Sequence, residues 1–129
     1  MIIKKMKNKY ILILGGNGKI GKPLAENLLY KDYSIISIDK KFDKKLKSKK
    51  ISYIQIDLLK KNSVKLLFNK IEKFNNIVGA VNCLYLKSRG WGTSFYKLNE
   101  SIVRDNLYTQ LGLPIILSKE ICKYFLKKK

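Results

Sequence analysis

Short runs of β-branched and other apolar residues alternate along the chain with longer stretches in which apolar positions recur every three or four residues. The short runs are continuously apolar, which is typical of parallel strands covered on both faces. The longer stretches have the period of amphipathic helices. This alternation predicts an α/β fold with about four strands, all parallel, at 10–14, 34–38, 51–56 and 77–82.

Two helices are expected between these strands. The first, over 19–31, has Pro23 in its first turn, where a missing N–H is tolerated. Its apolar face consists of Ile20, Leu24, Leu28 and Leu29. The second helix, over 62–74, has either Asn62 or Ser63 as its N-cap. Its apolar stripe consists of Val64, Leu67, Phe68, Ile71 and Phe74.

Two further segments differ in how much apolar surface they offer. Residues 40–50 contain too few apolar positions to bury a face, so an exposed loop or one frayed helical turn is expected there. Residues 99–125 contain enough apolar positions for a long helix. A kink is expected at Pro114, because its ring clashes with the carbonyl of Gln110 and Gly112 lies in the same turn.

Four glycines lie where the first expected strand ends and the first expected helix begins, and their spacing satisfies both GxGxxG and GxxGxxG. A dinucleotide-binding loop requires this context: glycine permits positive φ, close approach of the backbone to a pyrophosphate, and tight packing of helix on strand. The amides at the helix N-terminus then face the phosphates. No GK[ST] follows, which excludes a P-loop. The candidate binding residues of this loop are Gly15, Gly16, Asn17, Gly18, Lys19, Ile20 and Gly21.

Asp39 ends the second expected strand, 18 residues after Gly21. An acidic side chain at this point accepts hydrogen bonds from the adenosine ribose hydroxyls and repels a 2′-phosphate. The predicted cofactor is therefore NAD. NADP remains possible, because Lys19, Lys40 and Lys41 are close enough in sequence to neutralise a phosphate.

Composition and charge narrow the classes of protein to which the chain can belong. The 129 residues suit a single domain, 1–129, and carry 28 Lys plus Arg against 9 Asp plus Glu. This excess suggests an anionic partner, but only two of the cations are arginines, so a nucleic-acid binder is not favoured. The chain has no His and two separated cysteines, which argues against a metal site. The first ten residues lack a signal-peptide core and no apolar run is long enough to span a bilayer, so we expect a cytoplasmic protein.

From about Lys9 onward the chain resembles the N-terminal half of the short-chain dehydrogenase/reductases. "LGGNGKIG" resembles their glycine loop, "IDK" their second-strand acid, "QIDLL" their third-strand Asp, and "AVNCLY" the region after strand four. The resemblance implies a Rossmann-like three-layer fold, truncated relative to the full family. It also implies that Asp57 and Leu58 flank the adenine and that Asn82, Cys83 and Leu84 lie beside the ribose. An Asp at a strand end is alternatively a helix cap, and a buried Asn is alternatively glue between strands.

The segment from Leu84 to Phe125 is most similar to the family branch that serves nonulosonic acid synthesis. That similarity implies a sugar or sugar-nucleotide substrate and places Gln110 where the family has an active-site Asn, with Asn106 one turn earlier. The catalytic Ser and Tyr-x-x-x-Lys would come after residue 129; Tyr124 and Lys128 match only as letters. We therefore expect a cofactor-binding half, working as a homo-oligomer or with a second chain, and alternatively a non-catalytic nucleotide-binding or interaction module.

Overall fold

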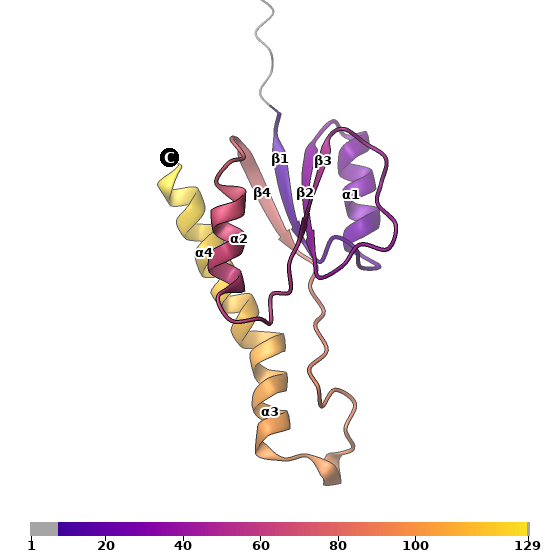
Figure 1. Ribbon diagram of the computed structural model, residues 1–129, viewed down its shortest axis with the longest axis vertical. Helices are drawn as coiled ribbons and strands as arrows, with labels where there is room; N and C mark the ends of the chain where they lie inside the picture. Colours follow the sequence, from indigo (N-terminus) through magenta and orange to yellow (C-terminus); the bar gives the residue numbers. More distant parts are fainter. Residues whose placement is uncertain (1–7, 129) are drawn as a thin grey trace, which may run out of the picture. The chain divides into compact units, whose positions relative to one another are not determined.

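The structure is a computed structural model that describes residues 8–128 (Figure 1). Seven of the first ten residues, which we expect to lack a signal-peptide core, lie outside the described residues. The chain divides after Leu84 into two compact units, and each is described by itself. The single domain expected over 1–129 stays a prediction.

The first unit contains a four-stranded sheet with helices on two sides. In chain order its elements are β1 (Tyr10–Leu14), α1 (Gly21–Tyr30), β2 (Ser34–Asp39), β3 (Ile51–Gln55), α2 (Ser63–Ile71) and β4 (Ile77–Asn82). The strand order is β3-β2-β1-β4, and every pairing is parallel. Helices α1 and α2 lie on opposite sides of the sheet (Figure 1). The predicted α/β class and its parallel four-stranded sheet are confirmed.

The core of this unit follows from the two-residue period of the strands. Ile13 and Ile35 face α1 and form a buried cluster with Ala25, against which Leu24 and Leu28 pack. Alternate strand residues point to the other face of the sheet. These are also buried, at most 2% exposed: Leu12, Leu14, Ile36 and Ile38. Burial on both faces explains why β1 and β2 appear in the sequence as continuous apolar runs.

One sequence expectation about the helices of this unit is wrong and another holds only in part. The expected apolar face of the first helix includes Ile20, but α1 begins only at Gly21 and the Ile20 side chain is 72% exposed. Asn62, one of the two expected residues, stands at the N-cap position of α2, but neither residue caps the helix with its side chain. Asn62 has left-handed backbone (φ 62°) and makes no side-chain cap bond, while the Ser63 hydroxyl donates to the carbonyl of Leu58. Residues 40–50 form no helix or strand, as expected for a loop.

The second unit is helical. It contains a 3₁₀ turn η1 (Phe95–Lys97), α3 (Glu100–Leu107), a π-helical segment η2 (Tyr108–Gly112) and α4 (Leu113–Lys127). The long helix expected over 99–125 is therefore divided. The disturbance lies in the turn expected from Pro114, but it takes the form of a π-helical segment that contains Gln110 and Gly112. Asn99 caps α3 by accepting the backbone N–H of Ile102.

Candidate functional site

The glycine loop after β1 is attached to the end of β2. The backbone amides of Gly15 and Gly16 both donate to the carbonyl of Ile38, at 2.8 and 3.0 Å. Gly15 has φ +79°, which L side chains rarely adopt. A tight turn follows, in which the Gly18 amide donates to the carbonyl of Gly15 at 3.1 Å. The loop thus turns the chain from the carboxyl end of β1 directly into α1.

Space around the loop explains why glycine stands at its first and last positions. A Cβ at Gly15 would lie 2.8 Å from the carbonyl oxygen of Cys83, after β4. A Cβ at Gly21 would lie 2.2 Å from the carbonyl oxygen of Gly15. Gly18 is exposed, and a Cβ there would lie 3.2 Å from that same oxygen. Gly15 and Gly21 are therefore required by close backbone packing, Gly15 against the end of β4 and Gly21 against the loop itself.

Asp39 joins the glycine loop to the end of β2. Its Oδ2 accepts the backbone amide of Asn17 at 2.9 Å, and its Oδ1 accepts the amide of Lys40 at 2.7 Å. Asn17 also donates through Nδ2 to Asp43 at 3.4 Å. The side chain proposed to receive the ribose therefore already holds the loop through a charge-assisted hydrogen bond. No spacing or motif in the sequence predicts the bond between Asp39 and Asn17.

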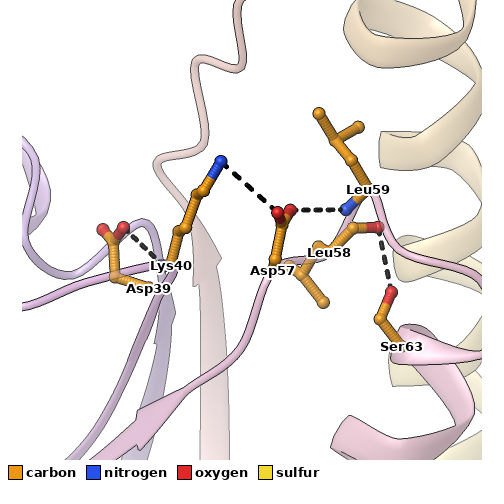
Figure 2. Close-up of polar contacts among 6 residues, drawn as sticks. All are labelled: Asp39, Lys40, Asp57, Leu58, Leu59 and Ser63. Carbon is orange, nitrogen blue, oxygen red and sulfur yellow. Dashed lines mark hydrogen bonds and ion pairs between the residues drawn. The ribbon is translucent and has the colours of Figure 1, made fainter.

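A second acidic side chain, Asp57 after β3, forms an ion pair with Lys40, the residue that follows Asp39 (Figure 2). The ammonium of Lys40 lies 3.4 Å from Asp57 Oδ2, and Asp57 Oδ1 accepts the amide of Leu59 at 3.1 Å. Asp57 precedes α2 by a whole turn and bonds within its own loop, so the helix-cap alternative for it is wrong. Leu58 is 5% exposed and buried, whereas Leu59 is 40% exposed.

The end of β4 completes the edge. The Cys83 amide donates to the carbonyl of Leu14 at 2.8 Å, which continues the pairing of β4 with β1. Asn82 is exposed and its Oδ1 accepts the amide of Leu84 at 3.0 Å. The alternative in which Asn82 is buried and joins strands is therefore wrong, because the strand ends there and the side chain closes a local turn.

These contacts bring together the predicted residues of the first unit at the carboxyl ends of all four strands. Parallel α/β sheets bind ligands outside this edge. The N-terminal end of α1 carries a partial positive charge, and its first turn, wholly within the described part of the chain, has no acidic side chain. Two of the predicted residues, Lys19 and Ile20, are exposed on the glycine loop. The edge is chemically suited to an anion flanked by hydroxyl groups.

Comparison with known proteins agrees with this geometry. Residues 11–94, more than half of the chain, match the NAD dependent epimerase/dehydratase family. The chain belongs to this family. The predicted resemblance to the N-terminal half of a short-chain dehydrogenase/reductase is confirmed at the level of the superfamily and of the Rossmann-like fold.

Individual relatives of this NAD dependent epimerase/dehydratase chain extend over nearly all of it. Post-translational flagellin modification protein A from Campylobacter coli is 27% identical, over 95% of this chain and 52% of its own length. A short-chain dehydrogenase from Leptospira borgpetersenii with bound NAD⁺ has a TM-score of 0.79 at 24% identity, covering 99% of this chain and 52% of that one. ElxO with NADP bound has a TM-score of 0.74 at 25% identity, covering 93% and 51%. The chain spans about half the length of these relatives.

The second unit has its own polar contacts around the π-helical segment. The Gln110 amide donates to the carbonyl of Leu86, and the Ser88 hydroxyl donates to Asn106. Both amide side chains therefore hold the segment that precedes α3. Tyr124 is 8% exposed in α4, and the Lys128 ammonium lies 5.6 Å from the centre of its ring. This cation–π contact at a helix end agrees with a structural role for the Tyr124–Lys128 pair.

Burial raises the pKa of the Cys83 thiol above its ordinary value. The thiolate is the reactive form, so the pH at which Cys83 alkylation reaches half its maximal rate is expected to be higher in the folded protein than in urea. The measurement is the rate of iodoacetamide labelling against pH in the Cys122→Ser variant, in which Cys83 is the sole thiol. Equal midpoints in the folded and unfolded protein would contradict the burial of this thiol.

Proposed function

We propose that this chain binds NAD(H) at the carboxyl edge of its sheet, as the dinucleotide-binding part of a short-chain dehydrogenase/reductase-type oxidoreductase. The observation that supports this best is the junction of three elements by Asp39 and Lys40. Asp39 holds the glycine loop, and Lys40 reaches Asp57 at the end of β3. The glycine loop, Asp39 and Asp57 thereby form one connected set.

Each part of this edge has a role in the proposal. The loop from Gly15 to Gly21 and the N-terminus of α1 receive the pyrophosphate through backbone amides. Asp39 receives the ribose hydroxyls, and Asp57 with the leucines after it lies along the adenine. Because Leu58 is buried, the exposed side chain of Leu59 offers the more accessible apolar surface there. Asn82, Cys83 and Leu84 line the β4 side. NAD is preferred to NADP because of Asp39.

The substrate class is proposed as a sugar or sugar nucleotide. The similarity of residues 84–125 to the nonulosonic acid branch supports it, as does the similarity to a protein named for flagellin modification. Bound nicotinamide would supply hydride transfer. The proton-transfer residues Ser, Tyr and Lys are proposed to lie outside these 129 residues, so we assign no catalytic residue to this chain. A cytoplasmic location is proposed on the two free thiols, which are typical of reducing compartments.

Ligand-dependent thermal stability tests the proposed binding. A ligand that binds only the folded state stabilises it by an amount that grows with the logarithm of concentration, reaching about 2.7 kcal/mol at a hundredfold excess over Kd. We expect the melting temperature to rise progressively with NADH. AMP alone should give a smaller rise, since it lacks the pyrophosphate link. An unchanged melting temperature up to millimolar NADH would contradict the proposal.

We also infer that the outer edge of β4 pairs with a second polypeptide, either another copy of this chain or one that supplies the catalytic half. Within residues 8–128, β4 is hydrogen-bonded in the sheet to β1 alone, and Val78 and Val81 are 46% and 37% exposed. An unpaired strand edge with apolar side chains favours association.

Within residues 8–128, every helix is too short or too polar to span a bilayer.

Light scattering of the purified chain tests this pairing. We expect species larger than a monomer at tens of micromolar, and we expect Val81→Lys to shift the distribution towards monomer, because a charged side chain at an edge opposes strand pairing. Val103→Lys is the matched control, since Val103 is equally exposed (41%) but lies on α3. A wild-type protein that is entirely monomeric would contradict the inference.

A further inference from the structure

A fully buried hydroxyl lies beneath the glycine loop. Ser37, in the middle of β2, is 0% exposed, and among the described residues its Oγ has no hydrogen-bond partner. It stands between the apolar residues Ile36 and Ile38. Burying a hydroxyl without a partner is destabilising, and nearly all buried polar groups have one. An alanine would fill this position in the strand without that cost, so the serine requires another explanation.

Ser37 is the residue that excludes a side chain from Gly16. A Cβ at Gly16 would lie 2.0 Å from Ser37 Oγ, 3.1 Å from Ser37 Cβ and 3.3 Å from Ser37 Cα. The three nearest atoms thus all belong to one side chain and its Cα. The first and last glycines of the loop differ, because a Cβ at Gly15 or Gly21 would meet backbone atoms of the loop or of Cys83.

We propose that Ser37 is a positioning residue for the dinucleotide loop. Its hydroxyl occupies the place of a side chain at Gly16, while the next residue, Ile38, accepts the Gly16 amide at 3.0 Å. Two adjacent residues of β2 thus hold the loop. Ser37 does so through the contact of its side chain with Gly16, and Ile38 through the hydrogen bond that its carbonyl accepts from Gly16. Ser37 is buried and acts through Gly16, without touching a ligand. Its effect on affinity rests on the proposed NAD(H) binding, whereas its contact with the loop does not.

Rescue of one glycine variant by a second substitution tests the contact. Gly16→Ala is expected to weaken NADH binding at least tenfold and to lower the melting temperature. Adding Ser37→Gly removes the opposing side chain, so the double variant should regain most of both losses. Gly21→Ala is the matched control: its Cβ meets the Gly15 carbonyl, so Ser37→Gly should not rescue it. Double-mutant cycles on NADH affinity and on melting temperature measure the coupling between residues 16 and 37.

Ser37→Ala separates positioning from a merely structural role. Alanine has no hydroxyl to bury without a partner, so this variant should melt a few degrees higher than the wild type. Removing support beneath Gly16 should at the same time weaken NADH binding about threefold. Additive effects of Gly16→Ala and Ser37→Gly on melting, or unchanged NADH affinity in Ser37→Ala, would overturn the inference. A wild-type protein that does not bind NADH would refute the proposed function, and the melting cycle would still decide the Ser37 contact.

Discussion

Gly21→Ala is expected to lower the free energy of unfolding by about 3 kcal/mol, at the upper end of the cost of overpacking. Alanine favours helices over glycine by roughly 1 kcal/mol, so helix propensity alone predicts the opposite sign. The loss arises because the added Cβ would lie 2.2 Å from the Gly15 carbonyl oxygen, a backbone atom of a loop that two hydrogen bonds attach to Ile38. Urea unfolding followed by circular dichroism measures the change.

Gly18→Ala is the matched control, since it adds the same methyl group three residues earlier in the same loop. Its Cβ would lie 3.2 Å from the same carbonyl oxygen, and Gly18 is exposed. A shift of a few tenths of an ångström relieves that contact, so the expected loss is much smaller. Equal losses in the two variants would show that the close approach of Gly21 to Gly15 does not govern the stability of the loop.

Asp39→Ala is expected to weaken NADH binding by 10- to 100-fold and to abolish the preference for NADH over NADPH. The carboxylate accepts the amides of Asn17 and Lys40. A hydrogen bond to a charged group contributes about 1.5–3 kcal/mol, less where water reaches it. Loss of the acid also removes the repulsion of a 2′-phosphate and leaves Lys40 to attract it. Fluorescence titrations with NADH and NADPH measure both effects.

The chain offers a matched acidic control four residues further on. Asp43 accepts the side-chain amide of Asn17 at 3.4 Å and is exposed on the loop after β2. Asp43→Ala removes the same charge close to the glycine loop, but it leaves the hydrogen bonds of Asp39 intact. Its NADH affinity should stay within about twofold of wild type. Tighter binding of NADPH than NADH by the wild-type protein would contradict the assigned preference.

Elements fixed by local patterns were predictable from the sequence. The strand β1 and the strand β4 have the expected bounds, because continuous β-branched runs between turn signals leave few alternatives. The glycine spacing and the acid after β2 likewise identified the carboxyl edge of the sheet as the candidate site. All four strands pair in parallel, as expected when each is connected to the next by a helix or a long loop, but their order was not predicted.

Contacts between distant residues were not predictable in the same way. The bonds from Asp39 to Asn17 and from Lys40 to Asp57 depend on how the strand ends meet in space, and no spacing in the sequence encodes them. Ile20 matched a helical period but falls before the helix, because the loop continues to Gly21. Ser37 was not predicted as a site residue, because a serine within an apolar strand belongs to no recognised sequence motif. Its importance became apparent only from its contact with Gly16.

The most direct test of NAD(H) binding is a fluorescence titration of the purified wild-type chain with NADH at physiological salt. We expect a saturable increase in NADH emission, with one molecule bound per chain and displacement by NAD⁺. Gly21→Ala and Asp39→Ala should each reduce the affinity, and Asp43→Ala should not. An emission that rises only in proportion to the NADH added, with no saturation and no response to NAD⁺, would contradict it.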